Sequence, residues 1–179
     1  MLKFERLTDV SPPLYGDALK LYQASFPCHE QRTEPFQRLV VENAADYRFT
    51  LIYDGAEWVG ECLYWEGPGF RYVEHFCTRP ELRGRSYGAQ ALAKLREAGI
   101  PVILEIDPPG DDISRRRRGF YERCGFVENS FLHVHPTYHD GIPGHDLVVM
   151  SCPAELTQEE YAAFAAYLRG VVMAEKWTK

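Results

Sequence analysis

The stretch VEHFCTRPELRGRSYG, residues 73–88, joins an apolar strand to a helix through a loop that contains two glycines and a serine. The N–H groups at the start of a helix point outward together, with the positive end of the helix dipole behind them, so such a junction attracts anions. Gly84 and Gly88 have no Cβ and let a phosphate approach the backbone, while Arg83 and Arg85 add positive charge. The loop therefore predicts a diphosphate-binding site.

The distribution of charge favours the same kind of site. Residues 71–123 contain 11 Lys and Arg against 8 Asp and Glu, whereas the whole chain of 179 residues has a net charge of −6. A locally basic segment in an acidic protein fits the phosphates of a small ligand and argues against a nucleic-acid partner. The four consecutive arginines 115–118 spread around the circumference of a helix, so we interpret them as a solvated face, with two of them facing the ligand phosphates.

The remaining composition predicts a cytoplasmic protein. The longest apolar run, which contains Ala162–Leu168, is far shorter than the roughly 20 residues that cross a bilayer. The first residues lack the long apolar core of a signal peptide. The five cysteines form no CxxC pair, which favours reduced and mostly buried thiols. We therefore expect no membrane contact.

Hydrophobic periodicity on both sides of the loop predicts one mixed α/β domain. We expect strands at 2–7, 47–53, 57–65, 70–78, 101–106, 126–134 and 146–152, and helices at 14–25, 33–44, between Pro80 and Gly99, at 112–124 and from 157 onward. Three of these strands, 47–78, follow one another directly and predict an antiparallel meander. The expected architecture is a mixed, mostly antiparallel sheet flanked by helices over residues 1–152, with an extra C-terminal helix, residues 153–179, packed on the same domain.

Two motifs together resemble one family. Residues 73–88 are similar to the acetyl-CoA signature of the GCN5-related N-acetyltransferases (GNAT), in which Arg/Gln-x-x-Gly-x-Gly/Ala follows a strand, and Arg83, Ser86 and Gly88 match it. About 30 residues later, GFYERCGF at 119–126 resembles the family's second motif, a helix that ends in Phe-Tyr-Glu-x-x-Gly-Phe. Two positions depart from the pattern. Ser86 replaces the usual glycine, which a small side chain tolerates where φ is negative, and Ser114 replaces an asparagine that many members carry.

The resemblance implies direct transfer of an acetyl group from acetyl-CoA, as a co-substrate, to an amine of a small molecule or a protein. It also implies that no metal takes part and that a homodimer is possible. The residues that it implies for binding acetyl-CoA are Phe76, Cys77, Thr78, Arg83, Gly84, Arg85, Ser86, Tyr87, Gly88, Ala89 and Ser114.

The resemblance also implies two catalytic residues. Tyr121 is the candidate general acid that protonates the departing CoA thiolate, since a phenol of pKa near 10 suits that task. Glu74 is the candidate base that takes a proton from the attacking ammonium, directly or through water. Strand alternation places Glu74 on the same face as Phe76 and opposite His75. Glu61 and His75 are its rivals.

Several alternatives stay open at this point. The histidines have no fixed ligand spacing, so we interpret them as surface or core residues rather than a metal site; they are His133, His135, His139 and His145. The loop 136–145 and the segment 26–32 are candidates for the acceptor side. Glu30 and Glu34 there suit a cationic acceptor. A non-catalytic CoA-binding module is the alternative function, and transfer to a thiol or hydroxyl is a third.

Overall fold

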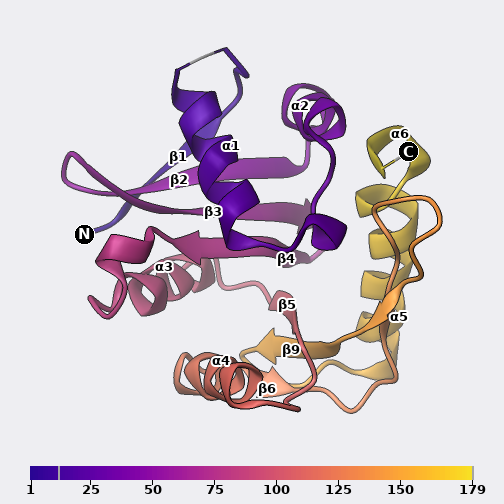
Figure 1. The fold of residues 1–179 in the computed structure, drawn as a ribbon. Coiled ribbons are helices and arrows are strands. Elements are labelled where there is room, and N and C mark those ends of the chain that lie inside the picture. Colours follow the sequence, from indigo (N-terminus) through magenta and orange to yellow (C-terminus); the bar gives the residue numbers. More distant parts are fainter. Residues whose placement is uncertain (12, 179) are drawn as a thin grey trace.

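The computed structural model describes residues 1–11 and 13–178 and has a seven-stranded sheet at its centre, in the order β1-β2-β3-β4-β5-β9-β6 (Figure 1). The strands are β1 (Lys3–Leu7), β2 (Tyr47–Asp54), β3 (Glu57–Gly67), β4 (Phe70–Thr78), β5 (Val102–Ile106), β6 (Val127–Glu128) and β9 (Val148–Cys152). All neighbours in the sheet are antiparallel except β4 and β5, which are parallel. A small second sheet pairs β7 (Val134–His135) with β8 (His145–Asp146).

Helices cover both faces of the large sheet (Figure 1). They are α1 (Leu14–Ser25), α2 (Glu34–Asn43), α3 (Tyr87–Arg96), α4 (Asp112–Arg123), α5 (Gln158–Tyr167) and α6 (Glu175–Thr178). One hydrophobic core lies between the sheet and α1, α2, α5 and α6, and a second lies under α3 and α4. No helix in the described parts of the chain has the length and apolarity to span a bilayer.

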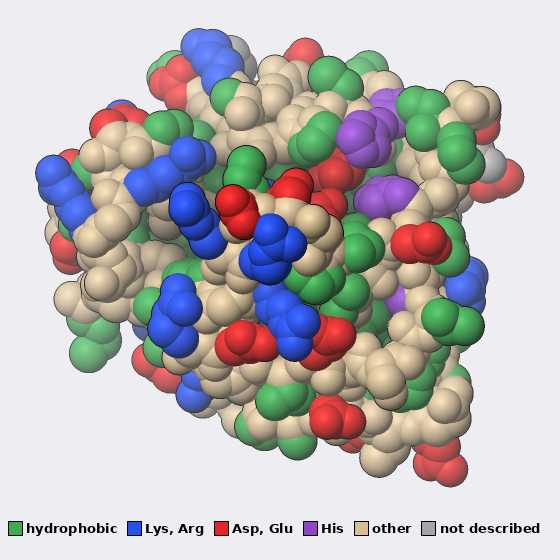
Figure 2. All heavy atoms as spheres, turned by 60° about the horizontal axis from the view of Figure 1, so that its bottom comes forward, with side chains coloured by type: hydrophobic (Ala, Val, Ile, Leu, Met, Phe, Trp, Pro, Cys, Tyr) green, Lys and Arg blue, Asp and Glu red, His purple; other side chains and the backbone are tan. Residues whose placement is uncertain are grey.

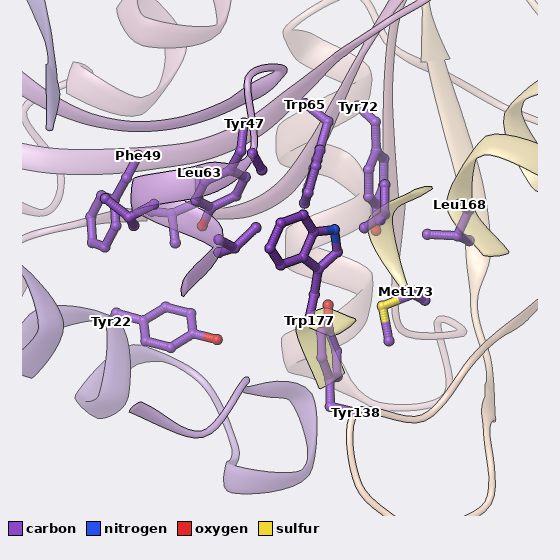
Figure 3. Packing of buried hydrophobic residues seen from close by; sticks show 14 of the residues in the cluster. Tyr22, Tyr47, Phe49, Leu63, Trp65, Tyr72, Tyr138, Leu168, Met173 and Trp177 are labelled. Carbon is purple, nitrogen blue, oxygen red and sulfur yellow. The ribbon is translucent and has the colours of Figure 1, made fainter. Parts of the chain in front are cut away.

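The C-terminal segment is an integral part of the first core. Figure 3 shows Trp177 and Met173 close to Trp65 and Tyr72 of the sheet. Phe164 of α5 is fully buried in the same cluster. Between α5 and α6 the chain forms a π-helical turn, Leu168–Val172. The helices after β9 therefore pack on the sheet rather than extending from it.

The predicted fold class is confirmed, and the meander and most predicted elements lie where the periodicity places them. The main difference concerns residues 126–134, which form only the short strand β6 and, farther on, β7. Asn129 ends β6 because its side-chain amide donates to Val149 O at 3.2 Å and Ser151 Oγ at 2.9 Å, and its Oδ1 accepts from Leu156 N at 2.7 Å. These bonds direct the chain out of the sheet.

A bulge in β4 changes which side chains share a face. Leu63 pairs with His75 and the next residue, Tyr64, pairs with Val73, so Glu74 is an extra residue opposite β3. Such a bulge interrupts the alternation of side chains. Glu74 and the ring of His75 both contact the α1/α2 side of the sheet, whereas Phe76 packs on the α3/α4 side. The expectation that Glu74 lies on the face of Phe76 is therefore wrong.

Candidate active site

A cleft of about 1060 Å³ lies where β4 and β5 diverge. The β4–β5 ladder ends at the pair Val73–Leu104, so the following residues of β4 face the cleft instead of a neighbouring strand. The walls come from the end of α1 and the segment after it, the loop before α3, one side of α4, and the β7–β8 sheet. The cleft therefore joins the predicted phosphate loop to residues that are far away in sequence.

The loop at one end of the cleft is built around two left-handed residues. Gly84 has φ of 82° and Ser86 has φ of 62°, and α3 begins directly afterwards at Tyr87. A Cβ on Gly88 would lie 3.1 Å from the ring of Phe120, so glycine here lets α3 pack closely on α4. The serine at 86 is thus accommodated in the left-handed region and not, as we expected, at negative φ. Such a conformation costs an L-residue on the order of 1 kcal/mol.

Most residues predicted to bind acetyl-CoA line this cleft: Phe76, Cys77, Thr78, Arg83, Gly84, Ser86, Tyr87, Gly88 and Ala89. Arg85 and Ser114 are not among the lining residues in the described chain. Ser114 is buried at the start of α4, where its N–H donates to Asp111 Oδ1 at 2.7 Å and its hydroxyl accepts from Asp111 N at 3.1 Å. It completes a capping box that fixes the first turn of α4.

Tyr121 of α4 lines the cleft. Its ring packs between Phe120 and Phe126, with centroid distances of 5.2 and 5.8 Å. Burial raises the pKa of the Tyr121 hydroxyl well above its usual value, and the nearby Arg117 opposes this only in part. The phenol is therefore protonated at neutral pH and can act as a proton donor.

Glu74 is held as a buried carboxylate in the cleft wall. Arg32 Nη1 lies 2.5 Å from its Oε1, and both side chains are fully buried. Tyr138 also donates to Oε1 at 2.8 Å, and Trp65 Nε1 donates to Oε2 at 2.9 Å. Burial alone would raise the pKa of Glu74, but Arg32 and these donors hold it below its usual value. Glu74 is therefore ionised, and both of its carboxylate oxygens accept hydrogen bonds.

The two rivals of Glu74 differ from it in charge. Burial raises the pKa of Glu61 well above its usual value, so this carboxyl is neutral, and it does not line the cleft among the described residues. His75 does line the cleft, but burial lowers its pKa to about 4, and its Nε2 contacts Glu30 O at 2.8 Å. Neither group combines negative charge with a position at the cleft.

A second carboxylate, Glu105 of β5, lies in the cleft wall and was missed by the sequence analysis. Its side chain is 5% exposed, Tyr72 donates to its Oε2 at 2.5 Å, and His133 Nε2 contacts its Oε1. Burial would raise the pKa of Glu105, but His135, His133 and Tyr72 hold it below its usual value. The signal was present in the strand itself, because Glu105 interrupts the otherwise apolar sequence VILEI.

Histidines gather around this second carboxylate. His135 Nε2 lies 3.8 Å from Glu105 Oε2, and the His135 and His145 rings are 5.7 Å apart. On the face drawn in Figure 2, basic side chains gather in one part and histidines in another, beside acidic groups. Within the described chain, no group of histidine, cysteine and acidic residues has the geometry of a metal site.

The arginine run is mostly paired. Arg115 pairs with Asp112, Arg117 with Asp107 at 2.6 Å, and Arg118 with Glu122 and Glu128. Arg117 also lines the cleft. These surface pairs fit the solvated-face interpretation. Of the four arginines, one, Arg117, is among the lining residues in the described chain, where we expected two to face the ligand phosphates.

Comparisons with known proteins agree with this architecture. Residues 45–128 match the acetyltransferase (GNAT) domain family. YjbC of Bacillus subtilis (strain 168), whose name assigns it to the acetyltransferases, is 26% identical over 104 residues. That match covers 56% of this chain and 52% of YjbC, so the chain spans about half the length of this curated relative.

Solved structures show a likeness over a larger share of the chain. A Bacteroides thetaiotaomicron protein assigned by name to the GNAT family is 28% identical, with a TM-score of 0.90 over 96% of this chain and 98% of that one. A GNAT acetyltransferase from Elizabethkingia anophelis with acetyl-CoA bound shares the fold, at 14% identity and a TM-score of 0.53 over 84% of this chain and 96% of that one.

Proposed function

We propose that the chain is an acetyltransferase of the GNAT type, which transfers the acetyl group of acetyl-CoA to an amine; the family match over residues 45–128 and the likeness to a solved structure over 96% of the chain support this. One observation carries the proposal. A single cleft is lined by a loop suited to a diphosphate, by a protonated tyrosine and by two ionised carboxylates. Acetyl-CoA and an acceptor that arrives as an ammonium ion require these groups in one site.

The chain's own backbone supplies most of the contacts for acetyl-CoA. The amide N–H groups of the first turn of α3 have no acceptor inside the helix and face the diphosphate. Residues 76–78 of β4, past the end of the β4–β5 ladder, would hold the pantetheine arm through their backbone groups, as an added strand is held. A β4 N–H would polarise the thioester carbonyl. Ser114 acts through the capping box that fixes α4 and hence Tyr121.

The nitrogen of the acceptor releases two protons in the reaction. The ammonium loses the first, its nitrogen attacks the thioester carbonyl carbon, and the C–S bond breaks as the C–N bond forms. Tyr121 gives its proton to the departing thiolate. The new amide nitrogen loses the second proton and the Tyr121 phenolate takes up one proton again, so that for each ammonium acetylated one proton ends on the CoA sulfur and one in solvent.

Of the two carboxylates, we assign proton removal to Glu105 rather than to Glu74. Arg32, a permanent cation in contact with Glu74, disfavours the protonated carboxyl that a base has to form. The partners of Glu105 are Tyr72, His133 and His135, and no arginine of the described chain pairs with it. In this proposal Glu74 supplies the fixed negative charge that attracts the ammonium.

The acceptor end favours a cation. Glu30 and Asp107 both line the cleft, and burial together with the nearby Asp107 raises the pKa of Glu30. Two carboxylates that repel one another are stabilised when an ammonium lies near them. We therefore propose a cationic amine of a small molecule or of a protein as the acceptor.

Release of CoA thiol, detected with DTNB across a panel of amines, tests the function. An exposed cysteine, Cys28, also reacts with DTNB, so each rate is corrected with a blank that lacks the amine. We expect release with a cationic amine and a loss of about 100-fold in kcat in Tyr121→Phe. Glu105→Gln should lower kcat at least as much as Glu74→Gln. A larger loss of kcat in Glu74→Gln would indicate that Glu74 is the base.

Calorimetry with CoA separates the alternatives. Binding of CoA without thiol release for any amine, thiol or hydroxyl acceptor would indicate a non-catalytic CoA-binding module. If CoA does not bind even at millimolar concentration, the assignment of the loop before α3 to the diphosphate is refuted.

A further inference from the structure

A histidine and a carboxylate face each other in the cleft wall without a hydrogen bond between them. Nε2 of His135 lies 3.8 Å from Oε2 of Glu105, and both residues line the cleft. A hydrogen bond from a nitrogen to an oxygen is about 2.7–3.2 Å long, so this separation is too large for one. The two side chains are 3% and 5% exposed. The cleft wall therefore holds two buried polar groups that lie close together but do not satisfy each other.

The other ring nitrogen of His135 determines the role of Nε2. Nδ1 lies 2.6 Å from Pro136 O, and a backbone carbonyl oxygen only accepts hydrogen bonds, so Nδ1 carries a hydrogen. In neutral His135 the lone pair then lies on Nε2, beside Glu105. Among the hydrogen bonds of the described chain, none is donated to Nε2. Neutral His135 therefore has an acceptor that the described chain does not use.

Oε2 of Glu105 can also accept one more hydrogen bond. Tyr72 donates to Oε2 at 2.5 Å, and His133 contacts Oε1. A carboxylate oxygen has two lone pairs, so a second donor can bind to Oε2. The carboxylate is ionised. Oε2 of Glu105 and Nε2 of neutral His135 are thus two acceptors 3.8 Å apart, and the first of them carries negative charge.

Neighbouring groups hold the His135 ring in place. The ring of Tyr138 stacks on it with a centroid distance of 5.2 Å and an interplanar angle of 27°. The strands β7 and β8 pair His135 with His145, whose ring lies 5.7 Å away. A Cβ on Gly144 would lie 2.6 Å from His135 O, so this close approach of the two strands requires glycine. The small sheet therefore sets the position of Nε2 without a bond to Glu105.

We propose that His135 is a specificity-determining residue that binds the acceptor nitrogen together with Glu105, an inference that rests on the proposed function. An ammonium group has several hydrogens to donate and no lone pair, so it can bridge two acceptors at once. One N–H points to Glu105, which takes that proton. A second N–H donates to His135 Nε2 and stays on the nitrogen while the freed lone pair attacks the thioester carbon. The nitrogen releases this second proton to solvent after the C–N bond has formed.

This arrangement favours nitrogen acceptors over oxygen and sulfur acceptors. A hydroxyl or a thiol has one hydrogen, and once the base has taken it no hydrogen is left for His135 Nε2. A buried acceptor without a donor is unfavourable. A quaternary ammonium has the same charge as a primary one but no N–H. The site thus recognises hydrogens on nitrogen, whereas carboxylates alone would recognise only the positive charge.

Two substitutions separate the roles of the two ring nitrogens. In His135→Asn the side-chain amide can still donate to Pro136 O, but no atom replaces Nε2. In His135→Gln the longer side chain can place its amide oxygen near the position of Nε2. We expect His135→Asn to lower kcat/KM for a reactive amine by about tenfold and to leave KM for acetyl-CoA unchanged. His135→Gln should recover about threefold of this loss. Equal losses in the two variants, or no loss in either, would overturn the inference.

A binding measurement on the wild-type protein does not depend on turnover. The 15N resonance of His135 Nε2 is read by NMR at a pH where the ring is neutral, with CoA present. It should move when n-butylammonium is added. n-Butyltrimethylammonium, which has the same charge and no N–H, should leave it in place. A shift with both cations, or with neither, would contradict the proposed hydrogen bond. A shift with n-butylammonium alone, in a protein that releases no CoA with any amine, would support the site and refute the proposed function instead.

Discussion

Replacement of Arg32 by methionine should leave the Glu74 carboxylate buried without its cation. We expect Arg32→Met to lower the free energy of unfolding by about 3–5 kcal/mol at pH 7. The estimate follows from the burial of both side chains and the 2.5 Å contact between them. Trp65 and Tyr138 keep their hydrogen bonds to Glu74 but supply no full charge. The bond from Arg32 to Val172 O, 2.8 Å, is lost as well.

The effect of this variant depends on pH in a defined direction. In the wild type the pKa of Glu74 lies below its usual value, so the stabilisation is present above about pH 4.3 and is lost as the pH falls through the folded-state pKa. In Arg32→Met burial acts without Arg32 and raises the pKa of Glu74. The carboxyl then takes up a proton at higher pH, so the difference in stability between wild type and variant should shrink on acidification.

Urea unfolding followed by tryptophan fluorescence at pH 7 and pH 5 measures these differences. The double variant Arg32→Met/Glu74→Leu removes both charges and should cost much less than the sum of the two single variants, because no charge is left buried alone. A cost below about 1 kcal/mol for Arg32→Met, which is typical of an exposed pair, would refute the reasoning. So would single costs that add to within about 0.5 kcal/mol of the double variant.

Three further predictions concern the cleft. Gly88→Ala places a Cβ 3.1 Å from the Phe120 ring. It should lower the free energy of unfolding, measured in urea, by about 1–3 kcal/mol and weaken CoA binding in calorimetry. The control Gly16→Ala, whose Cβ would have no heavy atom within 4 Å, should do neither. Burial lowers the pKa of His75 to about 4, so on acidification the unfolded chain binds a proton at this residue before the folded chain does. The free energy of unfolding should therefore fall between about pH 6.5 and pH 4. His75→Phe should flatten this part of the plot of unfolding free energy against pH, measured by urea titration. Ser114→Ala should lower stability by about 1 kcal/mol through the lost capping box, and a loss of CoA affinity in calorimetry beyond tenfold would show a direct contact with the ligand instead.

The sequence was sufficient for the features that depend on local pattern. Alternation over 47–78 predicted the meander, and the change to helical spacing after Pro80 predicted the loop whose residues line the cleft. The positive φ of Ser86 was not readable, because serine gives no signal for the left-handed region. A glycine does indicate that such a conformation can occur, and Gly84 adopts it.

The acceptor end could not be read in the same way because it depends on contacts between distant segments. The bulge at Glu74 leaves no mark in a strand sequence, yet it decides that this carboxylate meets Arg32 from the segment between α1 and α2. Glu105 was visible as a charge in an apolar strand, but its partner His133 lies 28 residues away. Neither pairing follows from periodicity.

The C-terminal helices connect these distant contacts to one another. Arg32 holds Glu74 on one side and Val172 O of the π-helical turn on the other. Earlier in the same segment, the Tyr161 hydroxyl lies within hydrogen-bond distance of His133, and His133 in turn contacts Glu105. Glu74 and Glu105 are thus both linked, directly or through one further residue, to residues 158–172. A change in the packing of this segment should alter the acceptor end while leaving the CoA end, built from β4, α3 and α4, in place.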